Sequence, residues 1–160
     1  MSFSAWRITK QEHTATAFSG EGARLYGGRW NSPGVSLVYT AQSRALAALE
    51  MLVHLESPAL LKKYLLFEVS FDSSYVQQLS LDDLPTDWRS DPPPSSTQAI
   101  GDAWATSLAS PVMLVPSVLI PGESNFLLNP RHSQFPELRI GDPVPFEFDP
   151  RLVTRKAAKK

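Results

Sequence analysis

The sequence has no cysteine, no long apolar run and almost no net charge, and each lack excludes a class of protein. Without cysteine in its 160 residues, the chain has no disulfide, no thiolate nucleophile and no zinc–thiolate site. The formal net charge of -1 predicts no general attraction to nucleic acid or to an acidic membrane. No apolar stretch is long enough to span a bilayer, and the polar first residues predict no secretory signal. We therefore expect a cytoplasmic protein without direct nucleic-acid or membrane partners.

A metal centre is not expected either, because the three histidines, His13, His54 and His132, are scattered along the sequence. Hydrophobic residues make up 42% of the chain and charged residues 19%, which predicts a packed fold rather than disorder. A chain of 160 residues is enough for one domain with a core of its own. We expect that domain over residues 1–150, followed by a basic tail over residues 151–160.

Residues 22–50 place a cation, an aromatic ring and a carboxylate in successive predicted elements. Gly27 and Gly28 directly precede Arg29, and glycine permits a sharp bend of the backbone there. An arginine next to Trp30 and an amide side chain can contact a phosphate and a base. A simple glycine turn with a solvated arginine is the alternative interpretation.

A strand and a helix are predicted to follow this turn. Residues 35–40 are rich in β-branched residues and predict a strand with Tyr39 near its end, although a core tyrosine would fit the same pattern. Residues 43–55 predict a helix that begins at Ser43 as its N-cap. Glu50 has mostly apolar neighbours in that helix. A partly buried functional carboxylate and an ordinary surface glutamate both remain open for it.

The rest of the chain predicts short elements separated by proline. Residues 65–71 predict a central strand, residues 98–110 a helix that ends before Pro111, and residues 146–148 an edge strand. Ser117 directly follows a strand break at Pro116, where a serine bonded to the backbone is the simplest interpretation. These patterns predict a single α+β domain with a small, mostly antiparallel, twisted sheet and helices packed at its sides.

Ordered blocks across most of the chain resemble the RES domain family. The blocks, GARLYGGRWNSPG, LVYTAQS, ALAALE, GDAW and VPSVLIPGESNFLLNPRH, cover about residues 6–148. The family consists of bacterial toxins, usually encoded beside an Xre-type helix-turn-helix antitoxin, and its characterised members resemble ADP-ribosyltransferases in fold. The resemblance implies an ADP-ribosyltransferase-like sheet, an antitoxin partner, and NAD as a substrate rather than a resident cofactor. It also implies cleavage of NAD by hydrolysis, by phosphorolysis or by transfer of ADP-ribose to a protein.

The resemblance further implies which residues carry the chemistry. The expected catalytic residues are Arg29, Tyr39, Glu50 and Ser117, with Ser124 as the alternative serine. Trp30 and Asn129 stand where the family is expected to contact its substrate, and no residue is expected to bind a metal.

Each residue type suits one part of NAD. An arginine can bind the pyrophosphate, and a carboxylate can stabilise the positive charge that develops on the ribose. An aromatic ring can form a flat wall beside the nicotinamide, and Ser117 could hold a phosphate, the ribose or the nucleophile. The sequence lacks G-x-G-x-x-G after a predicted strand, so NAD is expected in a cleft and not as a hydride carrier on a Rossmann fold.

One alternative comes from a different class of protein. A catalytically silent domain could keep the NAD site and serve mainly to bind an Xre-type antitoxin. The sequence also leaves open whether the chain forms a homodimer, and which of the three reactions an active enzyme would perform.

Overall fold

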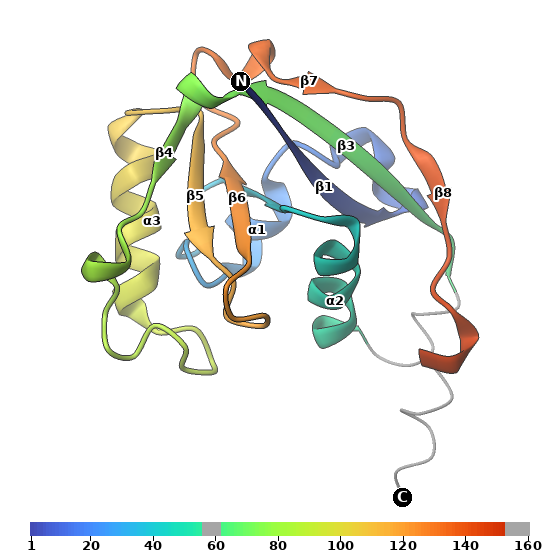
Figure 1. The fold of residues 1–160 in the computed structure, drawn as a ribbon, viewed down its shortest axis with the longest axis horizontal. Helices are drawn as coiled ribbons and strands as arrows, with labels where there is room; N and C mark the ends of the chain where they lie inside the picture. The colour runs from blue at the N-terminus through green and yellow to red at the C-terminus, as the bar shows by residue number, and fades with distance from the viewer. Residues whose placement is uncertain (56–61, 153–160) are drawn as a thin grey trace, which may run out of the picture.

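One curled sheet organises the fold, and the computed structural model describes it over residues 1–55 and 62–152. The strands run in the order β4-β5-β6-β2-β1-β3-β7, with β8 also paired to β3 (Figure 1). Every pair is antiparallel except β4 with β5. The strands are β1 (Ser2–Lys10), β2 (Val38–Ala41), β3 (Tyr64–Asp72), β4 (Val76–Gln78), β5 (Val112–Pro116), β6 (Ser124–Leu128), β7 (Arg139–Ile140) and β8 (Val144–Phe146).

The helices come from three separate parts of the chain. Within the described residues, the α-helices are α1 (Glu21–Tyr26), α2 (Arg44–His54) and α3 (Ser95–Ser107). Short 3-10 segments are η1 (Gln11–Thr16), η3 (Ser73–Tyr75), η4 (Leu81–Asp83) and η5 (Phe135–Glu137). None of the helices in this part of the chain is long and apolar enough to cross a membrane.

The alternation of side chains along the strands divides the core into two faces. On one face, Val38 of β2 belongs to an apolar cluster that extends across the sheet to β3. On the other face, Tyr39 packs with the cluster around Trp104 of α3, and Ala41 packs with the cluster around Leu46 of α2. Residues 39 and 41 point to the same side of β2, so α2 and α3 cover the same face of the sheet. This shared face brings the residues of the candidate site together.

A seam divides the sheet between β1 and β2. β1 pairs with β3 from Ser2 to Lys10, whereas the register of β1 with β2 consists of the pair Trp6 and Ala41. Arg7 adds a second link, since its Nη1 donates to the carbonyl oxygen of Tyr39 at 2.9 Å. Loss of water around the guanidinium lowers the pKa of Arg7 to about 10. The sheet is therefore two strand groups joined by one residue pair and by the half-buried guanidinium of Arg7.

The start of α2 confirms the sequence-based prediction, whereas the start of β2 does not. The N–H of Leu46 donates to Ser43 Oγ at 3.1 Å, as expected for an N-cap. The strand predicted over residues 35–40 begins only at Val38. The carbonyl oxygen of Val35 instead accepts a hydrogen bond from Asn31 Nδ2 at 3.0 Å, which holds the preceding residues in a turn.

The helix predicted over residues 98–110 lies three residues earlier, over Ser95–Ser107. It begins directly after Pro94, which serves as the N-cap, a position where the missing N–H of proline removes no bond within the helix. It ends at Leu108, which adopts the left-handed conformation with φ 54°, and not at Pro111. Residues 153–160 of the expected basic tail lie outside the described residues.

Candidate active site

Glu50 of α2 reaches the ends of β5 and β6, where two side chains hold one of its oxygens. Its Oε1 accepts a hydrogen bond from Asn125 Nδ2 at 3.1 Å and another from Ser117 Oγ at 3.3 Å. Asn125 lies on β6 opposite Ala41 of β2, and Ser117 follows the last residue of β5. Within the described residues, Oε2 of Glu50 has no hydrogen bond. The carboxylate is thus fixed at one oxygen and free at the other.

Ser117 is the serine that meets Glu50. Its side chain is 1% exposed, and its Oγ also accepts hydrogen bonds from the N–H groups of Leu119 and Ile120. The backbone N–H of Ser124 donates to Gln42 Oε1 at 2.7 Å, and none of its hydrogen bonds in the described residues involves Glu50. The buried Ser117 hydroxyl therefore closes the turn after β5 and orients the carboxylate.

Arg29 lies in the glycine turn, as the sequence indicates. Gly27 has φ 72°, a conformation that other residues rarely adopt, and the N–H of Gly28 bonds to the carbonyl oxygen of Asn31 at 2.9 Å. Nη1 of Arg29 donates to the carbonyl oxygens of Trp88 and Ser90, both at 2.8 Å. Among the described residues, nothing bonds to its Nε or Nη2. The guanidinium is therefore anchored on one side and keeps N–H donors on the other.

Tyr39 locks this turn to the sheet. Its hydroxyl accepts a hydrogen bond from the N–H of Trp30 at 3.0 Å and donates one to Asn31 Oδ1 at 2.6 Å. Burial raises the pKa of Tyr39 above its ordinary value of 10.0, and the nearby Asp102 carboxylate adds to this rise, whereas the Arg29 charge opposes it. The hydroxyl is therefore a structural bridge, and both its donor and its acceptor capacity are used.

Replacing Tyr39 with Phe should destabilise the fold by about 2 kcal/mol, because two buried groups of the turn lose their partner. Urea denaturation at pH 7 measures this loss. The pKa of Tyr39 is higher in the folded than in the unfolded chain, so native stability should fall as the pH rises above about 10. Tyr39→Phe should lose less stability over that range, and an equal loss would contradict a buried, neutral tyrosine.

Helix α3 packs against the same turn. Gln98 Nε2 donates to the carbonyl oxygen of Gly28 at 3.1 Å, and the Asp102 carboxylate accepts from both the N–H and the hydroxyl of Ser32. Gly101 is in such close contact that an added Cβ would lie 1.6 Å from the carbonyl oxygen of Trp30. Gly101 and Asp102 belong to the GDAW block of the sequence, whereas no motif in the sequence marks Gln98.

The Arg29 turn and the Glu50 cluster lie on the same face of β2 and β6. Tyr39, which bonds to the turn, is paired with Leu127, and Ala41 is paired with Asn125, which bonds to Glu50. Two residues along a strand correspond to about 7 Å. The structure therefore brings Arg29, Tyr39, Glu50 and Ser117 to one region.

Trp30 and Asn129 do not present their side chains to this region. The ring of Trp30 is 2% exposed and packs with Trp104 in the core beneath α3. Asn129 follows β6 at the end opposite Ser124, where its Nδ2 donates to the carbonyl oxygen of Ala105 at 3.0 Å. Both residues hold α3 against the sheet, and their contact with a substrate stays a prediction.

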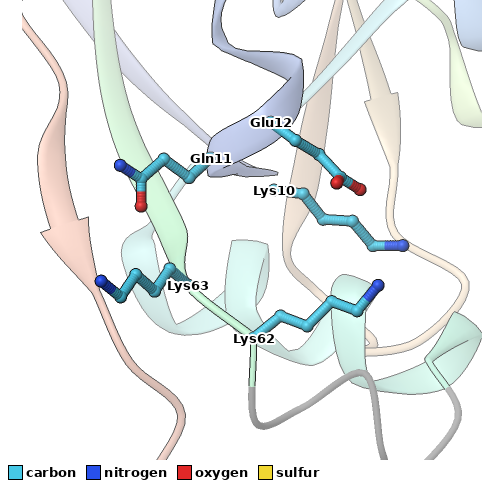
Figure 2. Close-up of a pocket in the computed structure, with 5 residues that line it drawn as sticks. All are labelled: Lys10, Gln11, Glu12, Lys62 and Lys63. Atoms are coloured by element: carbon cyan, nitrogen blue, oxygen red, sulfur yellow. The ribbon is translucent and has the colours of Figure 1, made fainter.

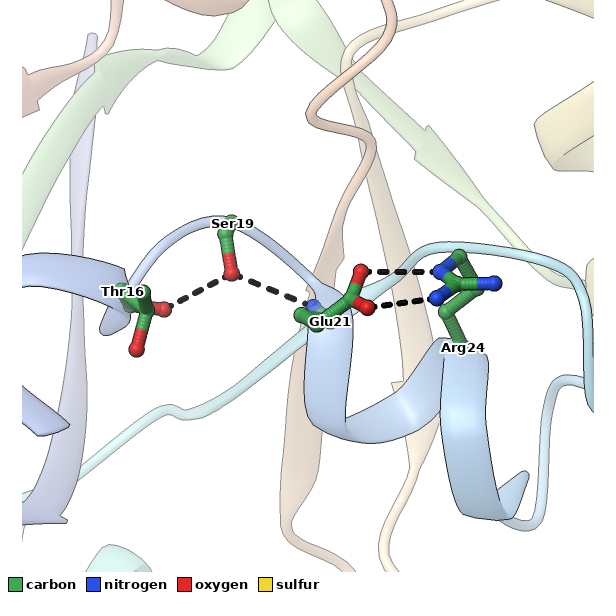
Figure 3. A network of polar contacts seen from close by, with 4 residues as sticks. All are labelled: Thr16, Ser19, Glu21 and Arg24. Atoms are coloured by element: carbon green, nitrogen blue, oxygen red, sulfur yellow. Dashed lines mark hydrogen bonds and ion pairs between the residues drawn. The ribbon is translucent and has the colours of Figure 1, made fainter.

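Arg24, the other arginine of this stretch, is occupied at the surface. Its Nε donates to Glu21 Oε2 at 2.8 Å within α1, as Figure 3 shows. The N–H of Glu21 in turn donates to Ser19 Oγ at 3.2 Å, and that hydroxyl donates to the carbonyl oxygen of Thr16 at 2.9 Å. Arg24 is therefore paired with a carboxylate, whereas Arg29 has no carboxylate partner among the described residues.

A shallow hollow of about 360 Å³ lies elsewhere, at the end of β1 (Figure 2). It is lined by Lys10, Gln11, Glu12, Lys62 and Lys63, and it includes none of the residues discussed above. The described part of the chain has no group of three or more His, Cys, Asp or Glu side chains that could hold a metal ion. The hydrogen bonds of Arg29 and Glu50, and not this hollow, mark the candidate site.

A family model described as the RES domain matches residues 4–149 of the chain. The chain belongs to the RES domain family. Toxin Res of Yersinia enterocolitica serotype O:8 / biotype 1B is 45% identical over 148 residues, which cover 92% of this chain and 97% of that toxin. The Prs ADP-ribosylating toxin of Sphingobium sp. (strain YBL2) is 38% identical over 162 residues, which cover 98% of this RES domain chain and 100% of that toxin.

The fold of this RES domain is also found in a solved structure. The crystal structure of the M. tuberculosis MbcT–MbcA toxin–antitoxin complex contains a chain that matches with a TM-score of 0.76 and 24% identity. The match covers 97% of the RES domain chain and 88% of that chain. The expected single α+β domain with a mostly antiparallel sheet is therefore confirmed.

Proposed function

We propose that this RES domain is the toxin of a toxin–antitoxin pair and that it cleaves the nicotinamide–ribose bond of NAD. The observation that carries the proposal is the Glu50 carboxylate, held by Ser117 and Asn125 on the sheet face that also carries the Arg29 turn. The names of its relatives, Toxin Res and Prs ADP-ribosylating toxin, support the same assignment.

In the proposed reaction, the leaving nicotinamide takes the bonding electron pair and the ribose carbon becomes positively charged. The free Oε2 of Glu50 would face that charge and accept hydrogen bonds from the ribose hydroxyls. Nε and Nη2 of Arg29 would bind the pyrophosphate, since an arginine can donate two parallel hydrogen bonds to a phosphate. Ser117 would act through Glu50, because its buried hydroxyl is already bonded to that carboxylate.

Incubation of the purified protein with NAD, followed by chromatography, tests the proposal. A hydrolase gives ADP-ribose, and a phosphorylase gives ADP-ribose 1″-phosphate only when phosphate is present. A transferase labels a protein, and Prs is an acceptor to include because it stands in the name of a relative. NAD that stays intact with water, phosphate and bacterial extract would reject the enzyme.

The alternative function is a catalytically silent NAD site whose main role is to bind an antitoxin. The MbcT chain, which shares this fold, was solved in a toxin–antitoxin complex. We propose an Xre-type antitoxin here, on the basis of the family resemblance. Specific binding of that antitoxin without any consumption of NAD would favour the silent domain.

Replacing Arg29 with Ala should relieve toxicity when the chain is expressed in bacteria without an antitoxin. The change removes the N–H donors proposed for the pyrophosphate. Colony counts after induction measure the effect, and denaturation of the purified variant shows whether it is folded. Arg139→Ala, an exposed change on β7, is the matched control and should leave toxicity intact. A folded Arg29→Ala chain that is as toxic as the native chain would contradict the assigned role.

A further inference from the structure

Asn125 has one side-chain atom bonded to Glu50 and another without a partner. Its Nδ2 donates to Glu50 Oε1 at 3.1 Å. Its Oδ1 is buried and has no hydrogen-bond partner among the described residues. The orientation of the amide follows from chemistry, because an ionised carboxylate can only accept, so the nitrogen must face Glu50.

We propose that Asn125 is a positioning residue that fixes the Glu50 carboxylate for NAD cleavage, an inference that rests on the proposed function. A half-buried glutamate on a helix can rotate about its side-chain bonds unless donors hold it. Ser117 and Asn125 supply two donors from two different segments, and both bond to the same oxygen. This arrangement leaves Oε2 directed away from both donors and available to the substrate.

The buried Oδ1, which has no partner among the described residues, favours a role for Asn125 beyond stability. A buried acceptor without a partner destabilises a fold, and an apolar side chain of similar size would avoid that cost. Asn125 also lies on β6 directly opposite Ala41 and Val115, where an apolar residue would fit the neighbouring core. The amide therefore lowers stability at this position while it orients the carboxylate.

One variant of similar size separates these effects. Asn125→Leu removes the donor to Glu50 together with the unpaired acceptor. Asn125→Leu should lower kcat for NAD cleavage by about 100-fold, as expected when a reacting group is misplaced by about 1 Å. Its KM should change less than about threefold, since the proposed pyrophosphate contacts remain. Its melting temperature should equal or exceed the native value.

Thr40→Val is the matched control on the opposite face of β2. It removes the hydrogen bond from Thr40 Oγ1 to the carbonyl oxygen of Phe126, the residue that follows Asn125. This variant should keep the native kcat and lose some thermal stability. An unchanged kcat in Asn125→Leu, or a fall in its melting temperature that accounts for the lost rate, would overturn the proposal.

An NMR measurement tests the contact between Asn125 and Glu50 without any assay of NAD cleavage. The side-chain amide protons of Asn125 should shift upfield in Glu50→Gln, because a charge-assisted hydrogen bond becomes a neutral one. If the native chain leaves NAD intact, the proposed function fails, whereas the amide shift still tests the contact. An unchanged amide signal would show that Asn125 does not hold the carboxylate.

Discussion

Replacement of Glu50 with Gln is expected to lower kcat for NAD cleavage by about 10²–10³-fold. Gln keeps the size of the side chain and an oxygen that can accept the bonds from Ser117 and Asn125. It lacks the negative charge that would stabilise the positive ribose in the transition state. Chromatography of NAD and its products at saturating NAD measures kcat, and urea denaturation tests the fold.

Glu68→Gln is the control for the Glu50 variant. Glu68 is an exposed residue of β3 whose carboxylate accepts a hydrogen bond from Ser4 Oγ at 2.8 Å. The same chemical change at this position should leave kcat at the native value. Native turnover by well-folded Glu50→Gln would remove Glu50 from the proposed mechanism, and equal losses in both variants would indicate a general effect of charge.

Replacement of Gly101 with Ala is expected to destabilise the fold by about 3 kcal/mol or more. Within a helix, alanine is by itself about 1 kcal/mol more favourable than glycine, so helix propensity alone predicts the opposite sign. The contact with the turn decides the outcome, because the new Cβ would lie 1.6 Å from the carbonyl oxygen of Trp30. Either α3 or the Arg29 turn must move, and the variant should accumulate poorly and unfold at lower urea concentration.

Gly22→Ala is the control for the Gly101 variant. Gly22 lies in α1, where an added Cβ would meet no heavy atom within 4 Å. The substitution should leave stability unchanged or raise it by about 0.5 kcal/mol. Equal stability of Gly101→Ala and Gly22→Ala would show that α3 does not press on the Arg29 turn.

Local patterns in the sequence predicted the helix and the turn that carry two of the candidate site residues. The helical spacing after Ser43 placed Glu50 on a helix, and the glycine pair placed Arg29 in a sharp turn. These predictions succeed because a cap, a helix face and a left-handed glycine depend on residues close in sequence. The family resemblance added Ser117, and the structure places its hydroxyl against Glu50.

The residues that local patterns missed act across long separations in the chain. Asn125 forms a hydrogen bond with Glu50, which lies 75 residues away in the sequence, and Asp102 forms one with Ser32, which lies 70 residues away. No periodicity encodes such a contact, because it depends on how the sheet curls and where α3 packs. Trp30 shows the converse, since its neighbours in sequence indicate a ligand contact whereas packing under α3 buries its ring.

The seam between β1 and β2 has a consequence for control of the proposed activity. α2 packs on Ile8 of β1 as well as on Ala41 of β2, so the helix that carries Glu50 spans the seam. The Arg29 turn, in contrast, is held by the hydroxyl of Tyr39, a residue of β2. A protein that bound both strand groups and rotated one relative to the other would tilt α2. This tilt would change the distance between Glu50 and Arg29. Such a protein would inhibit by binding at the outer edges of the sheet, without entering the substrate region.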